Sequence, residues 1–119
     1  MKAKLHPERF AVVKTDEIPE DFFAVVKLSE VTAVVPESAV ANLKVKEAEY
    51  GFRLITFEVN LPFDTVGFIS RISKALADAG IPILVYSSYH TDHILVKEDF
   101  VDRAIETLRN IGFVVEEGW

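Results

Sequence analysis

The most informative stretch of the chain is Asn60-Leu61-Pro62-Phe63-Asp64-Thr65-Val66-Gly67-Phe68. It joins a predicted strand over residues 52–60, where polar residues alternate with aromatic and β-branched ones, to a predicted helix over residues 65–79 with apolar residues at helical spacing. Asp64 suits the N-cap of that helix, and Gly67 falls in its first turn. Exposed N–H groups at the positive end of a helix, beside a residue without a side chain, form a place where a carboxylate can dock. The alternative is a capped helix whose glycine permits close packing against the sheet.

Three further strands and a second helix are predicted after this helix. The strands cover residues 81–89, 93–97 and 113–116, and the apolar start of the first of them predicts burial on both faces. Asp99 suits the N-cap of the second helix, and Gly80 and Gly112 fit the ends of the two helices. The predicted order β-α-β-β-α-β is the ferredoxin-like arrangement, which belongs to the α+β class.

The first 50 residues follow a shortened version of the same plan. We expect a strand over residues 10–13, at most one helical turn over 18–22, a hairpin of 23–28 with 31–35, and a short segment over 38–43 where the second helix would be. The polar segment 44–51 ends in glycine and is the expected boundary. The sequence therefore predicts a degenerate unit over residues 1–48 and a complete unit over residues 49–119. His6 is assigned to a mobile terminus.

Composition narrows the class of partner. The 119 residues are 50% hydrophobic and carry a net charge of −6, with scattered Lys and Arg, which argues against nucleic acid and anionic membranes as partners. No apolar run approaches the roughly 20 residues that span a bilayer, and no signal peptide is recognisable, so we expect a cytoplasmic protein. The mean hydropathy of +0.21 is high for a lone small domain. We therefore expect a homodimer or a higher oligomer.

The segment around the predicted turn at residues 90–92 holds several residues of catalytic type. Its Ser87, Ser88, His90, Asp92 and His93 lie consecutively along a hairpin, whereas a catalytic triad requires side chains that converge. Asp and Thr are common at such turns because they hydrogen-bond to the backbone. The chain has no cysteine, which excludes thiolate chemistry. We predict no catalytic residues, no metal site and no cofactor.

The residues then point to a family. The start of an ACT domain resembles the stretch Leu54-Ile55-Thr56-Phe57-Glu58-Val59-Asn60 followed by Leu61 to Phe68. The joint between helix and strand in that module resembles Ala75 to Ile83. Ser87 to Val96 resembles the hairpin of the aspartate-kinase-type ACT subfamily, found in small stand-alone proteins and in the arginine-sensing CASTOR proteins. The resemblance covers residues 51–116 closely and residues 8–50 only as a degenerate leading ACT-like half. It includes no kinase segment.

The resemblance implies an amino-acid site between two ACT copies, formed by the loop of one copy and the start of the second strand of its neighbour. The residues so implicated are Leu61, Pro62, Phe63, Asp64, Val66, Gly67, Phe68, Ile81 and Ile83. The expected function is therefore a non-catalytic, allosteric regulatory module that binds a small ligand. The alternative is a ligand-free subunit that assembles an oligomer or regulates a partner protein.

Overall fold

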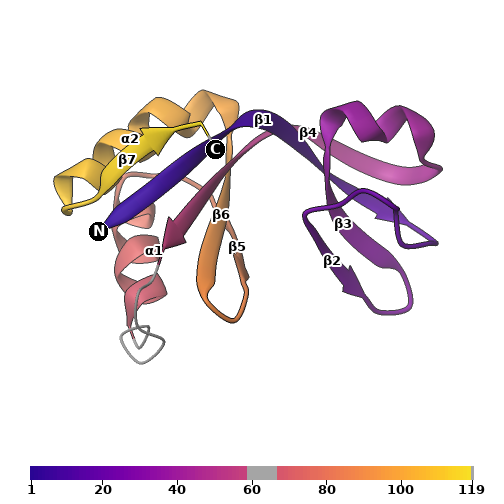
Figure 1. The fold of residues 1–119 in the computed structure, drawn as a ribbon, viewed down its shortest axis with the longest axis horizontal. Helices are drawn as coiled ribbons and strands as arrows, with labels where there is room; N and C mark the ends of the chain where they lie inside the picture. The colour runs from indigo at the N-terminus through magenta and orange to yellow at the C-terminus, as the bar shows by residue number, and fades with distance from the viewer. Residues whose placement is uncertain (59–66, 119) are drawn as a thin grey trace. The chain divides into compact units, whose positions relative to one another are not determined.

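The chain folds into an α+β structure whose contacts divide it into two compact units (Figure 1). The computed structural model describes residues 1–58 and 67–118. The larger unit comprises Met1–Pro7 and Arg53–Trp119, and the smaller unit comprises Glu8–Phe52. Two long strands, β1 (Lys2–Thr15) and β4 (Val45–Glu58), contribute residues to both units.

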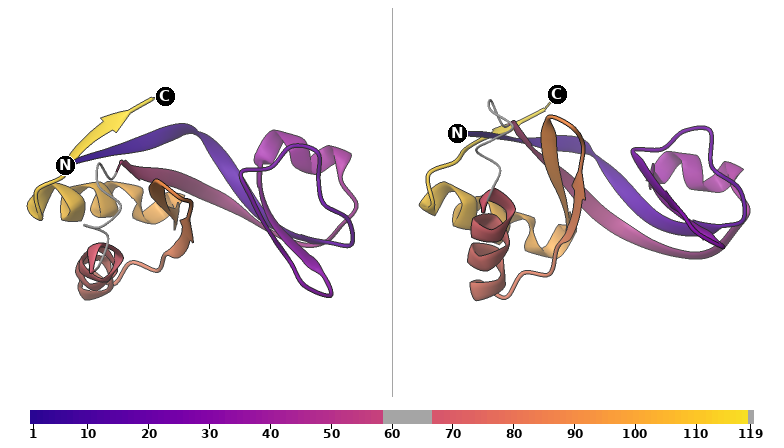
Figure 2. Two further views of the ribbon diagram at one scale, coloured as in Figure 1. Left: turned by 60° about the horizontal axis from the view of Figure 1, so that its bottom comes forward. Right: turned by 90° about the horizontal axis from the view of Figure 1, so that it is seen from below.

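The larger unit contains the predicted alternation of strands and helices. After β4 come α1 (Phe68–Asp78), β5 (Leu84–Ser87), β6 (Thr91–Lys97), the 3₁₀ turn η3 (Glu98–Phe100), α2 (Val101–Asn110) and β7 (Val114–Glu117). Its strands are ordered β5-β6-β4-β1, with β7 paired to β1. Figure 2 shows α1 and α2 together on one side of these strands. The predicted α+β order is confirmed for this part of the chain.

Three aromatic rings lie at the centre of the larger unit's core. Phe57 of β4, Phe68 of α1 and Phe113 pack edge to face, with ring centroids 5.2–6.0 Å apart. The remaining core residues are aliphatic and come from both helices, from strands β1, β4, β6 and β7, and from Ile81 after α1. Apolar residues at helical spacing on α1 and α2, such as Ile72 and Leu108, supply the helical side of this core.

The N-terminus is a strand of the larger unit, so the prediction of a mobile terminus at His6 is wrong. Lys2 to Leu5 pair in parallel with Val114 to Glu117, and Ala3 and Leu5 are 0% and 2% exposed. The polar–apolar alternation of these few residues is too short to stand out in the sequence. Residues 1–7 therefore group with residues 53–119 rather than with residues 8–48, which differs from the boundaries expected from the sequence.

The smaller unit has the strand order β2-β3-β1-β4. The predicted hairpin is confirmed: β2 (Ala24–Lys27) pairs antiparallel with β3 (Val31–Pro36), which pairs antiparallel with β1. The 3₁₀ helix η1 (Glu37–Asn42) follows β3. The polar segment 44–51, expected to be a boundary, is almost entirely strand β4. Val45 and Ala48 pack against the small core of this unit, and that packing gives the segment a place in the sheet.

Three element boundaries differ from the sequence prediction. Helix α1 begins at Phe68 with Gly67 at the N-cap, whereas residue 65 was the predicted start. Helix α2 begins at Val101 after η3, and its N-cap is Phe100, so the predicted N-cap role of Asp99 is wrong. Strand β5 is shorter than predicted and outermost in its sheet. Its Leu84 and Val85 are therefore 39% and 41% exposed rather than buried on both faces.

Candidate functional site

The predicted ligand loop falls largely outside the described residues. The segment 59–66 contains five of the implicated residues, namely Leu61, Pro62, Phe63, Asp64 and Val66. The predicted N-cap role of Asp64 therefore also falls outside the described residues. The structure describes the other four implicated residues, which are Gly67, Phe68, Ile81 and Ile83.

Gly67 forms the start of helix α1 in a left-handed conformation. Its φ is 80°, which L-residues with a side chain adopt only with strain, and its carbonyl accepts the first helical hydrogen bond, from Arg71 N at 3.0 Å. A Cβ built on Gly67 would meet no heavy atom of the described residues within 4 Å. The glycine is therefore required by the backbone rather than by close packing. Because it has no side chain, it leaves the first-turn N–H groups without a cap from the N-cap residue itself.

Phe68 anchors the helix start from the core side. Its side chain is 6% exposed and packs against the rings of Phe57 and Phe113. The aromatic contacts hold the first helical residue against the sheet. The N–H groups of the first turn are thus presented by a fixed element.

Ile81 and Ile83 lie between the end of α1 and strand β5. The Ile81 N–H donates to the Leu76 carbonyl at 2.9 Å, a helix-ending bond that accompanies Gly80 at φ 74°. Ile81 is 3% exposed and belongs to the core, whereas Ile83 is half-buried and packs against that core. Ile83 is therefore the more accessible of the two.

A chain of polar side chains, missed in the sequence, crosses the larger unit. His6 Nε2 lies 3.1 Å from Thr56 Oγ1, which lies 2.7 Å from His93 Nδ1. On the other side of the ring, His93 Nε2 lies 2.7 Å from Thr91 Oγ1. The sequence contains no local signal for this arrangement because His6 and Thr56 are 50 positions apart.

Burial keeps both imidazoles neutral near pH 7. The pKa of His6 is lowered to about 4, first by burial and then by the nearby His93. The pKa of His93 is also lowered by burial, and the neighbouring Asp92 partly opposes that shift. The third histidine, His90, lies apart in the hairpin, where its ring packs edge to face against that of Tyr89 with 4.5 Å between the ring centroids. In residues 1–58 and 67–118, no three His, Asp or Glu side chains are grouped as metal ligands.

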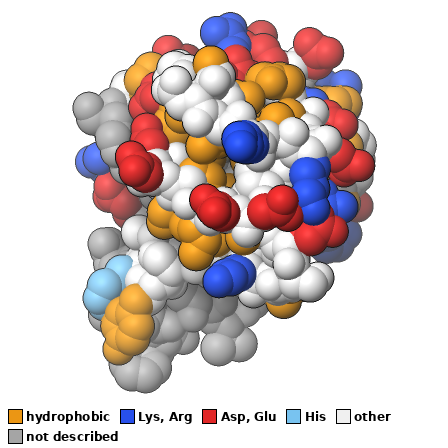
Figure 3. Space-filling view, turned by 90° about the vertical axis from the view of Figure 1, so that its right-hand side faces the viewer, with side chains coloured by type: hydrophobic (Ala, Val, Ile, Leu, Met, Phe, Trp, Pro, Cys, Tyr) orange, Lys and Arg blue, Asp and Glu red, His pale blue; other side chains and the backbone are white. Residues whose placement is uncertain are grey.

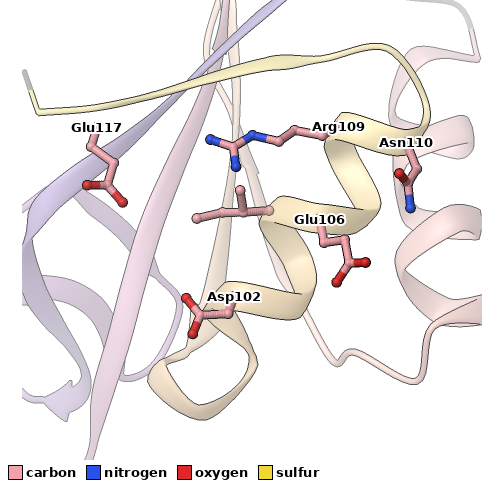
Figure 4. A pocket seen from close by; sticks show the side chains of 6 residues that line it. Asp102, Glu106, Arg109, Asn110 and Glu117 are labelled. Atoms are coloured by element: carbon pink, nitrogen blue, oxygen red, sulfur yellow. The ribbon is translucent and has the colours of Figure 1, made fainter.

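Two of the clefts formed by the described residues lie away from the implicated residues and are lined mainly by polar side chains. A shallow one of about 380 Å³ lies between α2 and the end of β7, where Arg109 is flanked by the carboxylates of Asp102, Glu106 and Glu117 (Figure 4). A second, of about 870 Å³, lies in the smaller unit between the segment 15–21 and η1. Figure 3 shows many Asp and Glu side chains around hydrophobic ones on the side of the molecule that lies to the right in Figure 1. Both clefts are lined by more acidic than basic residues.

The larger unit is a ferredoxin-like α+β domain whose first described helix begins after a glycine in the left-handed conformation. A sequence profile of the ACT domain matches residues 47–110, more than half of the chain, and the chain belongs to the ACT domain family. ACT domains are regulatory modules that bind small ligands. No curated protein matches this chain, and no helix within the described ranges is long and apolar enough to cross a membrane.

Solved structures show the same fold at low sequence identity. A protein from Agobacterium tumefaciens is 20% identical with a TM-score of 0.84, covering 99% of this chain and 93% of that one. A Vibrio cholerae protein of unknown function, described as a possible transport protein, is 21% identical with a TM-score of 0.74 (92% and 88% covered). The regulatory subunit of aspartate kinase from Thermus thermophilus, in its ligand-free form, is 11% identical with a TM-score of 0.64 (91% and 94% covered). At these identities the likeness establishes the fold alone.

Proposed function

We propose that this chain is a non-catalytic, allosteric regulatory module that binds an amino acid at an interface between two ACT copies. The observation that carries the proposal is the ACT match over residues 47–110, because one module then contains the helix start at Gly67 and the segment 81–83 that leads into strand β5. The likeness in fold to the regulatory subunit of aspartate kinase from Thermus thermophilus supports a regulatory role.

The proposed site combines the loop 61–68 of one copy with Ile81 and Ile83 of its neighbour. The ligand carboxylate accepts hydrogen bonds from the first turn of α1, where the helix dipole favours an anion. The open space around Gly67 supports this approach, since no described atom lies within 4 Å of the position that a Cβ would take. Asp64 in the same loop is the proposed partner of the ligand's ammonium group. Regulation follows if the ligand binds one arrangement of the two copies more tightly than the other.

We also propose that residues 1–48 contain a degenerate ACT-like half, which lies in the smaller unit. In the smaller unit the strand order β2-β3-β1 repeats the order β5-β6-β4 of the larger unit. The turn η1 follows β3 as η3 and α2 follow β6. Where the larger unit has α1, the described chain of the smaller unit has the segment 16–23 without a helix.

The second candidate function is a ligand-free subunit that assembles through sheet edges. Strand β5 favours it, because this outermost strand and its flanks carry no Asp, Glu, Lys or Arg from Ile81 to Thr91. Leu84 and Val85 are also substantially exposed there. Monomeric proteins usually protect such edges with charges, so this edge suits pairing with another chain.

A thermal-shift screen of the twenty amino acids distinguishes these two functions. A ligand at about 100 times its dissociation constant stabilises the folded state by about 2.7 kcal/mol, which is several degrees for a domain of this size. One amino acid, or a few related ones, should raise the melting temperature with a saturable dependence on concentration. Sedimentation with and without the ligand then tests the interface. A protein that responds to no amino acid yet sediments as an oligomer would support the ligand-free function instead.

A further inference from the structure

Five side chains form a continuous hydrogen-bonded chain across three strands of the larger unit. Beginning in β1, they are His6, Thr56 of β4, His93 and Thr91 of β6, and Ser88 in the hairpin before β6. The last contact joins the hydroxyls of Ser88 and Thr91 at 2.5 Å. The exposed hairpin is thereby linked to the buried ring of His6, which is 8% exposed.

This chain lies on the sheet face opposite the helices. The core that the helices cover contains Leu5 of β1 and Ile55 of β4. The next residue along each of these strands, His6 or Thr56, therefore points to the other face of the sheet. His93 immediately precedes Ile94, which belongs to the same core, and so also points away from the helices. Hydrogen bonds between side chains therefore connect β1, β4 and β6 on this face.

The hydroxyl of Thr56 limits how many extra protons the two imidazoles of this hydrogen-bonded chain can hold. Thr56 has a single hydroxyl proton, yet ring nitrogens of His6 and His93 both lie within 3.1 Å of its oxygen. If His93 becomes an imidazolium, both of its N–H groups donate, to Thr56 and to Thr91, and Thr56 still donates to His6 Nε2. All bonds survive this first protonation.

A second proton, on His6, breaks the pattern. His6 Nε2 then becomes a donor, so Thr56 Oγ1 receives two N–H groups and its own proton loses its acceptor. Two cations also share one oxygen in a partly buried place, where their repulsion is weakly screened. The geometry therefore tolerates one extra proton and opposes the second.

The surrounding charged groups do not remove the opposition to a second proton on His6. The nearby charged or titratable groups are Lys4 of β1, Arg53 and Glu58 of β4, Tyr86 of β5, Asp92 and Lys97 of β6, Glu98 of η3 and Glu116 of β7. Five of these are in ion pairs: Lys4 with Glu58 at 3.2 Å, Arg53 with Glu98 at 3.3 Å, and Glu116 with Lys2 at 3.7 Å. Burial raises the pKa of Tyr86, which stays neutral in acid, and Asp92 favours the imidazolium of His93.

We propose that His6, Thr56 and His93 form an acid-sensitive latch that holds the N-terminal part of β1 in the sheet and releases it when both imidazoles are protonated. The released segment is Lys2 to His6, which lies between β4 and β7 in the strand order. Its departure exposes Ala3 and Leu5 and frees the parallel partner of β7. Acidification then removes the N-terminal part of β1 from its place between β4 and β7, while α1 and α2 remain packed on each other.

The expected size of the effect follows from the two states of His6. With a pKa of about 4 in the latched state and an ordinary value of 6.5 when released, the opening equilibrium should rise on the order of 50-fold between pH 7 and pH 4.5. Amide hydrogen exchange of residues 2–6, expressed as protection factors, measures this directly. The amides of α2 serve as the reference for global unfolding.

The matched variants are His6→Gln and His90→Gln. Glutamine reaches the position of Nε2 and can bond to Thr56, but it does not titrate, so the variant should lose protection by only a few fold over the same range. His90 is exposed and outside the chain of bonds, so its variant should behave as the wild type. The carboxylates are identical in all three proteins, which isolates the contribution of His6.

An NMR titration of the wild type tests the order of events without any variant. His93 should protonate before His6, and protection of residues 2–6 should fall as His6 protonates. The latch would be overturned if His6→Gln lost as much protection as the wild type at pH 4.5. It would equally be overturned if His6 became protonated in the wild type while residues 2–6 stayed protected.

Discussion

Replacement of Gly67 by asparagine tests the proposed ligand site at the point where the structure is most specific. The φ of 80° costs an ordinary L-residue about 1–2 kcal/mol, and asparagine tolerates this region better than alanine. No atom of residues 1–58 or 67–118 lies within 4 Å of the Cβ position, so the described residues add no steric overlap to this cost. Gly67→Asn should therefore unfold with a free energy of unfolding lowered by about 1 kcal/mol or less.

The same side chain would stand in the space through which a carboxylate reaches the first-turn N–H groups. We expect the affinity for the amino acid found in the screen to fall at least about tenfold, which is 1.4 kcal/mol. Gly112→Asn is the matched control, because Gly112 also has a positive φ, of 104°, and open space around its Cβ position. Titration calorimetry and urea unfolding of both variants provide the comparison. Unchanged affinity in Gly67→Asn, or an equal loss in both variants, would refute the assignment of the site.

Three further predictions follow from the packing, the histidines and the sheet edge. Phe57→Ala should lower the free energy of unfolding by about 3–5 kcal/mol in urea titrations, because it removes the ring that contacts both Phe68 and Phe113. Since the pKa of His6 is about 4 when folded and 6.5 when unfolded, its stabilisation is complete above pH 6.5 and is lost as pH falls toward 4. Urea titrations across this range should show a loss of about 3 kcal/mol that is absent in His6→Gln. Val85→Lys should leave stability within about 0.5 kcal/mol but shift sedimentation toward the monomer, because an edge lysine opposes strand pairing.

The order of elements in the larger unit was predictable because its apolar periodicities are long. The helical spacing of Ile69, Ile72 and Leu76 and the alternation in residues 52–58 each extend over many residues and leave little choice of element type. Helix boundaries were less predictable. Asp64 and Asp99 suit an N-cap better than Gly67 or Phe100, yet the described helices begin at Phe68 and Val101.

Features that depend on distant residues could not be predicted. The pairing of Lys2–Leu5 with Val114–Glu117 joins segments near the two ends of the sequence, and neither four-residue segment specifies the other as its partner. The chain from His6 to Ser88 likewise exists only because β1, β4 and β6 are neighbours in the sheet. His93 lies in a hairpin among residues of catalytic type, and its contact with Thr56 joins positions 37 apart in the sequence. Side chains that meet through strand pairing are visible once the strand order is known, and not before.

Both candidate functions involve strand β5 and the residues just before it. They can be distinguished by whether ligand binding is coupled to association of two copies at this edge. Ile83 directly precedes the uncharged edge at Leu84 and Val85, so a neighbouring copy that pairs there would lie beside the residues proposed to complete its ligand site. If the ligand bridges two copies, ligand and association must strengthen each other by the same factor. Val85→Lys should then weaken amino-acid binding as well as association, although its side chain takes no part in the proposed site. If the edge serves assembly alone, the monomeric variant should bind the ligand as tightly as the wild type, and the site must be complete within one chain.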